Sequence, residues 1–424
     1  MKQARLEELL KHKGIGPKGS KSLRPEQLGE LQEILTSNEV SLTTKASFFT
    51  AFSLLENTPE ESLWFEKNQE LFPVEVLNLT KATDQLEGLV ARVLKRENLS
   101  YEDSRKALAW ILDETVDDYI KGAFLEAERL KRETFDENLG FLDELWNHSK
   151  RIETNLPIVI DLADNYDGFN RTYCYAPFLA ATLAACGYPT LIHGAKTAAP
   201  KFGWTSHQVL EEAKKNVKLT LEESRTQLEN IEIGWSYLDE SIFYPQMHKL
   251  HSMRKEMVKR PMLATFEKLM QPIRSVNGNY QALGYTHTAY RELLANLLVS
   301  FAKSPKAMVV RGVEGTSRPS LARKSIVMYY DGKESHEEHF LPEEFGIESR
   351  EEPLDKTITP QQNLEVGIEV LQGKPSVHRD VLLYWGCAVL SGFRFLTDEE
   401  ARQKLEKAID SGRALHHFNA FVDA

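Results

Sequence analysis

The sequence predicts an α/β protein in which a helical N-terminal module, present twice, precedes a doubly wound, mostly parallel sheet with helices on both faces. Three observations lead to this prediction. The chain has 424 residues, enough to bury two or three cores. Up to about residue 155, its apolar residues recur with helical spacing. From Leu156 onward, short apolar runs alternate with helical patterns, which is typical of parallel strands joined by helices.

The first third of the chain contains an internal repeat. Shifting Val40–Leu63 by 76 residues aligns it with Val116–Leu139, and 8 of the 24 positions are then identical. Two amphipathic helices could share this spacing by chance. Both segments, however, also contain Thr-x-x-Glu, a capping-box pattern that begins at Thr58 and at Thr134. We therefore interpret the repeat as the duplication of a small helical module.

The later elements can be placed one by one. The predicted strands, most of them buried on both faces, are 156–162, 188–194, 280–287, 306–312 and 325–332. The predicted helices between them are 176–187, 205–216 and 289–304. The acidic stretch 333–362 is predicted to be a solvated excursion with one short strand, and the last segment, from Arg379, to be helical. The resulting regions are 1–75, a basic arm and the first helical module; 76–155, the second module; and 156–424, the α/β domain.

The composition limits the cellular setting and the partners. Fifty-two Lys and Arg against 63 Asp and Glu give a net charge of −11, which on average repels nucleic acid and anionic membranes. A polyanionic partner would therefore need a local basic patch. The three cysteines, Cys174, Cys186 and Cys387, lack zinc-type spacing and fit buried thiols in a reducing compartment. Because no apolar segment approaches 18 residues, we expect a cytoplasmic protein with no membrane partner.

The segment 190–206 has the strongest ligand-binding pattern. A predicted strand leads into a His-Gly pair and a loop with two lysines, and a Thr-Ser pair follows at a predicted helix N-cap. Hydroxyl and backbone N–H groups at such a cap suit a phosphate, although the alternative is a loop whose lysines are merely solvated. We predict binding of a phosphorylated sugar or other anionic small molecule here. The candidate residues are His193, Gly194, Lys196, Lys201, Thr205 and Ser206.

A second loop, 161–177, also joins a strand end to a helix. Its carboxylates, Asp161, Asp164 and Asp167, could hold a divalent metal together with substrate phosphates, with Asp164 and Asp167 as the preferred pair. The candidates for direct contact with the substrate and its phosphates are Asp167, Gly168, Asn170, Arg171 and Thr172. The alternative interpretation is a plain Asp-Gly turn without a function.

Two basic stretches interrupt the acidic chain. One, at 247–274, contains Arg254, Lys255, Lys259 and Arg260; the other is an N-terminal arm that contains Lys18, Lys21 and Arg24. Such stretches are usually solvated helix faces or linkers. Beside an anion site they would instead contribute to binding, and a flexible basic arm could contact a nucleic-acid backbone.

Several motifs together resemble the anthranilate phosphoribosyltransferase family, whose fold is shared with the pyrimidine nucleoside phosphorylases. The motifs lie at Ala123–Glu137, 179–187, 192–194 with Lys201 and Gly203, and 409–415. The resemblance implies a small helical domain beside a doubly wound α/β domain. It also implies a cleft that binds phosphoribosyl pyrophosphate with Mg²⁺, transfer of the pentosyl group to an aromatic amine, substrate-cleft arginines at Arg254 and Arg260, and a homodimer formed through the helical domain.

The sequence departs from this family at the ligand-binding motifs. The glycine-rich loop falls at Ala163–Gly168, which reads ADNYDG, and the family's Asn-x-Ser-Thr motif reads CYAP at 174–177. Of the acidic pair expected after the strand ending at Gly312, only Glu314 is present. The Tyr-Asp-Gly loop at 166–168 and the N-terminal arm with Ile15, Gly16, Lys18, Gly19 and Leu23 look like those of divergent paralogues associated with nucleic-acid binding.

Two functional hypotheses follow. The first is a glycosyl transferase that moves a pentosyl or phosphoribosyl group, with the anion near Lys196, Lys201 and Thr205. The second is a catalytically inactive paralogue that binds nucleic acid through Lys18, Lys21, Arg24, Arg254, Lys255 and Lys259.

Overall fold

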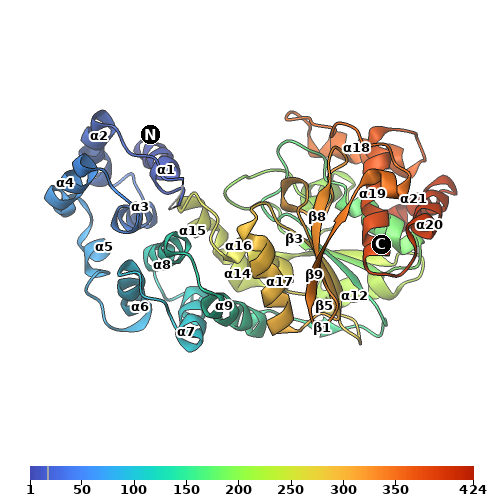
Figure 1. Cartoon of the computed structure of the whole chain (residues 1–424), viewed down its shortest axis with the longest axis horizontal. Helices are drawn as coiled ribbons and strands as arrows, with labels where there is room; N and C mark the ends of the chain where they lie inside the picture. The colour runs from blue at the N-terminus through green and yellow to red at the C-terminus, as the bar shows by residue number, and fades with distance from the viewer. Residues whose placement is uncertain (17–18) are drawn as a thin grey trace. The chain divides into compact units, whose positions relative to one another are not determined.

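The structure, a computed structural model, describes residues 1–16 and 19–424 (Figure 1). Lys18, one of the predicted nucleic-acid contacts, lies outside the described residues. The contacts within the chain define two compact units. The helical unit comprises Met1–His148 and Gln246–Phe266, and the α/β unit comprises Ser149–Pro245 and Glu267–Ala424.

Short helices with short connections build the helical unit. Those of its N-terminal part are α1 (Lys2–Lys13), α2 (Pro25–Leu35), α3 (Leu42–Leu54), α4 (Pro59–Lys67), α5 (Val74–Asn78), α6 (Gln85–Leu94), α7 (Tyr101–Leu112), α8 (Asp118–Lys131) and α9 (Phe135–His148). The later segment adds α15 (His251–Glu256) and α16 (Leu263–Phe266), with α14 (Pro245–Lys249) at its start. Residues 246–266 fall in the range assigned above to the third region, but α15 packs on α3 and α8 of the helical unit.

The internal repeat has a structural counterpart. Helices α2, α3 and α4 correspond at the 76-residue offset to α7, α8 and α9, and the equivalent helices α3 and α8 pack on each other. Gly122 in α8 permits this close approach, because a Cβ atom there would lie 2.7 Å from the Thr43 side chain. The two modules therefore share one core, in which α3 of the first module packs against its equivalent, α8, of the second.

Both predicted capping boxes are confirmed. Thr58 accepts a hydrogen bond from the backbone N–H of Glu61, and the Glu61 carboxylate accepts one from the Thr58 N–H. Thr134 and Glu137 exchange the same two bonds. These local bonds satisfy the free N–H groups at the starts of α4 and α9.

The α/β unit contains a seven-stranded sheet with the order β4-β3-β2-β6-β7-β8-β9. The strands from β4 to β7 are parallel, whereas β8 and β9 are added antiparallel at one edge. The seven strands are β2 (Ile160–Ala163), β3 (Thr190–Gly194), β4 (Trp235–Asp239), β6 (Tyr280–Gly284), β7 (Lys306–Val310), β8 (Ser325–Tyr330) and β9 (Ser335–Phe340). A separate two-stranded sheet pairs β1 (Ile152–Glu153) with β5 (Ile273–Arg274).

The predicted fold class, an α/β protein with a mostly parallel sheet after a helical part, is confirmed. The five predicted strands are present, although the first begins at Ile160 and not at Leu156, since Pro157 has no N–H for the ladder. Strand β4 was not predicted from the sequence because two polar residues, Ser236 and Asp239, interrupt its apolar pattern. Both are buried, and they find partners in Gln227 and His207.

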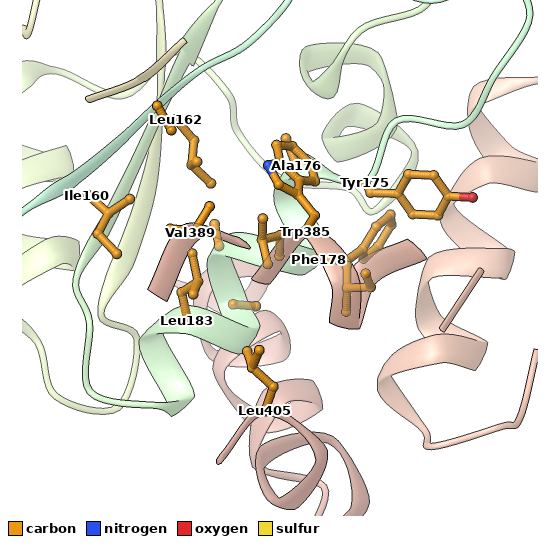
Figure 2. Close-up of a cluster of buried hydrophobic side chains, with 14 of the residues drawn as sticks. Ile160, Leu162, Tyr175, Ala176, Phe178, Leu183, Trp385, Val389 and Leu405 are labelled. Carbon is orange, nitrogen blue, oxygen red and sulfur yellow. The ribbon is translucent and has the colours of Figure 1, made fainter. Parts of the chain in front are cut away.

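Helices line both sides of the sheet, with α17 on one side and the C-terminal helices on the other (Figure 1). They are α10 (Ala176–Ala185), α11 (Ser206–Glu212), α12 (Leu221–Glu229), α13 (Glu240–Phe243), α17 (Ala289–Phe301), α18 (Pro360–Leu371), α19 (Val377–Gly392), α20 (Asp398–Asp410) and α21 (Arg413–Asp423). All ten residues of α10 are buried, and Figure 2 shows its Phe178 and Leu183 beside Trp385 and Val389 of α19. In the described ranges, no helix has both the length and the apolar character needed to cross a bilayer.

Candidate anion-binding site

The predicted ligand loops meet at the carboxyl ends of the parallel strands, where open α/β sheets bind their ligands. The loop after β2 and the loop after β3 run side by side, with Phe169 and Trp204 exchanging backbone hydrogen bonds of 2.7 and 3.0 Å. Gly168 and Gly203 make this contact possible, since a Cβ atom at Gly168 would lie 2.5 Å from the Gly203 backbone. Gly168 also has φ +77°, which favours glycine.

His193 is a structural residue of this region. Its ring is fully buried, with Nε2 3.0 Å from the Asp161 carboxylate and Nδ1 2.6 Å from the Tyr166 hydroxyl. In the tautomer with the proton on Nε2, the ring donates to Asp161 and accepts from Tyr166. Burial raises the pKa of Tyr166 well above its ordinary value, so the phenol keeps its proton. The predicted contact between His193 and a ligand is replaced by this internal chain of hydrogen bonds.

Asp164 is also held inside the protein. Its carboxylate accepts hydrogen bonds from the Ser206 hydroxyl and the Asn165 backbone N–H. Burial raises the pKa of Asp164, and these two hydrogen bonds only partly oppose the increase. Cys174 lies 3.2 Å from the Ser206 hydroxyl and is itself buried. Asp164 and Ser206 therefore fasten the loop after β2 to the start of α11.

The Glu314 carboxylate is the centre of a convergent set of donors. It accepts hydrogen bonds from the backbone N–H of Arg171 at 3.2 Å and from the backbone N–H and hydroxyl of Thr172, both at 3.1 Å. The ammonium group of Lys201 lies 2.9 Å from its other oxygen. We call the donors of Arg171, Thr172 and Lys201 the anion cradle. Three of the predicted phosphate-contacting residues thus converge on one anionic group.

The backbone around Glu314 is strained and held in place. Glu314 has φ +52°, an uncommon conformation for a residue with a side chain. Its carbonyl accepts a hydrogen bond from the Asn165 side chain, and the next carbonyl, that of Gly315, accepts one from Lys268 at 2.8 Å. Burial would raise the pKa of Glu314, but the charge and hydrogen bonds of Lys201 and Thr172 outweigh it and hold this pKa below its ordinary value. Glu314 is therefore an ionised carboxylate in the cradle.

The other candidates in the two loops lie away from the cradle. Lys196 is exposed and pairs with Glu211 at 2.9 Å. Thr205 caps α11 together with Gln208, and its hydroxyl donates to the Lys196 carbonyl. Asn170 is exposed beside Arg171, whereas Asp167 lies 3.9 Å from the Lys201 ammonium. Of the two lysines predicted to approach an anion, only Lys201 points into the cradle.

The carboxylates present do not fit a magnesium site. Asp164 is engaged by Ser206 and has a raised pKa, whereas Mg²⁺ requires ionised oxygen ligands with open positions for water. Among residues 1–16 and 19–424, neither Asp164 nor Asp167 belongs to a cluster of three metal-ligating side chains. Of the acidic pair expected after β7 only Glu314 is present, and its carboxylate is already engaged by Lys201 and Thr172.

The basic candidates belong to the helical unit and form no part of the cradle. Arg254 is only 1% exposed, so the predicted role of this side chain in binding nucleic acid lacks the required accessibility. Lys255 and Arg260 are exposed, and Lys259 is half-buried. In the N-terminal arm, the side chains of Lys21 and Arg24 are exposed.

Sequence reasoning did not identify Glu314 as the partner of the predicted cations. Its single signal was that it is the one acid in the segment VEGTSRPS after β7. Lys268 was also missed as a site residue, because it lies in the basic stretch 247–274, most of which belongs to the helical unit. The cradle becomes visible only when the three loops are placed together.

Comparison with known proteins agrees with this architecture. The a/b domain of the glycosyl transferase family matches residues 169–415, and the helical bundle domain of the same family matches residues 88–149. The chain is 26% identical over 340 residues to the anthranilate phosphoribosyltransferase of Acetivibrio thermocellus, covering 80% of this chain and 96% of that protein.

Solved structures show the same fold at lower identity. The anthranilate phosphoribosyltransferase of Thermus thermophilus has a TM-score of 0.66 at 19% identity, covering 79% of this chain and 98% of that chain. The Saccharomyces cerevisiae enzyme, in complex with PRPP and Mg, has a TM-score of 0.65 at 20% identity, covering 82% and 98%. Because the α/β family domain spans more than half of its length, the chain belongs to the glycosyl transferase family that includes these distant relatives.

Proposed function

We propose that the protein binds a phosphorylated pentose, with one phosphate group in the anion cradle. The observation that supports this proposal is the convergence of Arg171, Thr172 and Lys201 on a single carboxylate at the carboxyl ends of the sheet strands. Two backbone N–H groups, one hydroxyl and one ammonium are a donor set that suits a phosphate as well as a carboxylate. The yeast relative, described in complex with PRPP and Mg, supports the same ligand class.

The cradle also suits the family's chemistry, the transfer of a pentosyl group. In such a transfer the bond from the sugar's anomeric carbon to the leaving phosphate oxygen breaks, while a bond to the acceptor's nucleophilic atom forms. Negative charge then grows on the leaving phosphate, and donors already aimed at it stabilise the transition state. Lys201 supplies the full positive charge, and the N–H groups of Arg171 and Thr172 fix the position of the oxygens. No step here depends on magnesium, which the residues present do not fit.

Calorimetric titration tests the proposal directly. Phosphoribosyl pyrophosphate, ribose 5-phosphate and pyrophosphate are titrated with and without Mg²⁺, and we expect binding that does not require the metal. Lys201→Met should lower affinity at least about tenfold, since a hydrogen bond to a charged group contributes about 1.5–3 kcal/mol. Lys196→Met is the matched control, because this lysine pairs with Glu211 and should leave affinity unchanged. No binding at millimolar ligand, or equal losses in both variants, would refute the proposal.

A second candidate function is nucleic-acid binding by the helical unit. One observation favours it: burial lowers the pKa of Lys259, and the positive charges of Arg129 and Lys11 lower it further against the opposing charge of Glu126, so cations from three segments gather around one acid there. Lys255 precedes Lys259 in the same stretch and Arg260 follows it, and both side chains are exposed. This function predicts oligonucleotide affinity that falls steeply with salt and weakens in Lys255→Glu. A flat salt response would exclude it.

A further inference from the structure

The donors of the anion cradle are already satisfied without a ligand, because the protein's own Glu314 carboxylate accepts their hydrogen bonds. Glu314 satisfies the N–H of Arg171, both donors of Thr172 and the ammonium of Lys201, and its side chain is only 1% exposed. Any external phosphate that uses these donors must take the place of this carboxylate. The two groups cannot both accept the same hydrogens at these distances.

The backbone of Glu314 is strained in this arrangement. A side-chain-bearing residue at φ +52° is strained, and here it is followed by Gly315 at φ +87°. Hydrogen bonds from Asn165 and Lys268 to the carbonyls of Glu314 and Gly315 hold the strained turn. Withdrawal of the carboxylate breaks its bonds to the cradle, and release of the backbone strain together with the two carbonyl contacts would offset part of that cost.

We propose that Glu314 is a built-in competitor that occupies the phosphate position until a phosphate-bearing ligand displaces it. This inference rests on the proposed function, since it concerns the same cradle. A phosphate with two negative charges attracts the Lys201 ammonium more strongly than one carboxylate does. Ligands with a single negative charge, such as simple carboxylates, gain no such advantage over Glu314. The competitor therefore weakens the apparent affinity for every anion by the same factor, and only ligands that bind the open cradle strongly, such as dianionic phosphates, still displace it.

The competing explanation is that Glu314 only fastens the loops together. The two roles predict opposite effects of removing the carboxylate. If Glu314 is a fastener, its loss disorders the cradle and weakens phosphate binding. If it is a competitor, its loss empties the cradle and strengthens binding, because apparent affinity rises in proportion to the fraction of molecules with an open site.

Titration with inorganic pyrophosphate separates these roles. Glu314→Ala should bind at least about tenfold more tightly than the wild type, which corresponds to a cradle that the carboxylate fills at least about nine-tenths of the time. Glu314→Gln should show a smaller gain, because a neutral amide holds Lys201 less strongly than a carboxylate. The double variant Glu314→Ala with Lys201→Met should lose the gain. Glu369→Gln, which removes an exposed acid of α18 that pairs with Lys374, is the charge control and should change nothing.

Hydrogen exchange on the wild-type protein gives an independent measurement that needs no folded variant. With pyrophosphate bound, peptides covering 312–318 should exchange faster, because the displaced carboxylate releases the strained turn, whereas peptides covering 168–174 should exchange more slowly. Unchanged or weaker pyrophosphate binding in both Glu314 variants, or slower exchange of 312–318 on binding, would overturn the competitor. If neither the wild type nor any Glu314 variant binds pyrophosphate, the proposed function itself fails.

Discussion

The helical unit and the α/β unit each contain a buried carboxylate, Glu61 in the first and Glu314 in the second. The two accept hydrogen bonds from nearly the same kinds of donor, but their backbone conformations differ. Glu61 accepts N–H groups from Thr58 and Leu23 and the ammonium of Lys13, all at 2.8–3.0 Å. Glu314 accepts two N–H groups, a hydroxyl and an ammonium at 2.9–3.2 Å. Glu61 lies within a regular helix start, whereas Glu314 lies in a turn with φ +52°.

The difference shows which carboxylate can be exchanged for a ligand. Lys13 and Glu61 are both 0% exposed, so neither charge reaches solvent, and the other polar partner of the Lys13 ammonium is the neutral Glu56 carbonyl at 3.0 Å. Lys201 is 17% exposed and also donates to the Gly168 carbonyl at 2.8 Å. Loss of Glu61 therefore strands a buried charge, whereas Lys201 can reach water or a bound phosphate. The comparison therefore predicts that the same chemistry fastens the fold in one unit and forms an exchangeable site in the other.

The largest predicted effect is in Glu61→Gln. The amide keeps the shape of the capping box but leaves the Lys13 ammonium buried without a counter-charge, which should cost about 3–5 kcal/mol of unfolding free energy. Urea denaturation measures the loss, and hydrogen exchange assigns it to α1–α4. Glu66→Gln, an exposed acid on the same helix, is the control. A loss below about 1 kcal/mol would show that Lys13 and Glu61 contribute like a solvated pair.

The equivalent substitution in the second module, Glu137→Gln, should cost less. Glu137 occupies the same repeat position and accepts N–H groups from Thr134 and Leu99, but its lysine, Lys131, lies 3.2 Å from a second carboxylate, that of Glu128. With the charge of Glu137 removed, the pKa of Glu128 falls and its carboxylate can ionise as the counter-charge of Lys131, so we expect a loss of about 1–2 kcal/mol, mostly from the weakened hydrogen bonds.

The measurement is the same urea series, with Asp136→Asn, exposed on the same helix, as the control. Equal losses in Glu61→Gln and Glu137→Gln would contradict the distinction between one and two carboxylates per lysine. This would mean that the capping box alone sets the cost.

Glu128→Gln should stabilise the helical unit at neutral pH. Burial, and then the charge of Glu137, raise the pKa of Glu128 well above its ordinary value, so the folded state binds a proton that the unfolded state releases near pH 4.3. The favourable contribution of this protonation is present below that pH and is lost as the pH rises through the folded-state pKa. At pH 7 the neutral amide of the Glu128→Gln variant avoids the free-energy cost of keeping a carboxyl group in this buried position. The unfolding free energy should therefore rise by about 1 kcal/mol or more. Urea midpoints between pH 5 and 8 should fall with pH in the wild type and flatten in the variant.

What could be predicted from the sequence depends on how local the determinant is. The capping boxes at Thr58 and Thr134 were predictable because their bonds join residues three apart. Strand β3 was predictable because its apolar run alone directs it to the core. The cradle was not, because Glu314 meets Thr172 across 142 residues, and nothing in either segment specifies the other. The cations on two predicted loops could be identified from the sequence. The anion that they bind, the protein's own Glu314 carboxylate, could not.

The smallest predicted change in stability is in Glu314→Gln. Lys201 retains the Gly168 carbonyl and access to water, and the glutamine oxygen can still accept from the Thr172 N–H, so unfolding free energy should fall by less than about 1 kcal/mol. The same urea series measures it beside Glu61→Gln. A loss as large as that of Glu61→Gln would place Glu314 among the structural carboxylates. A small loss of unfolding free energy together with tighter pyrophosphate binding would distinguish the two units as the comparison predicts. Of the two carboxylates, Glu314 in the strained turn can leave without stranding a buried charge, whereas Glu61 cannot.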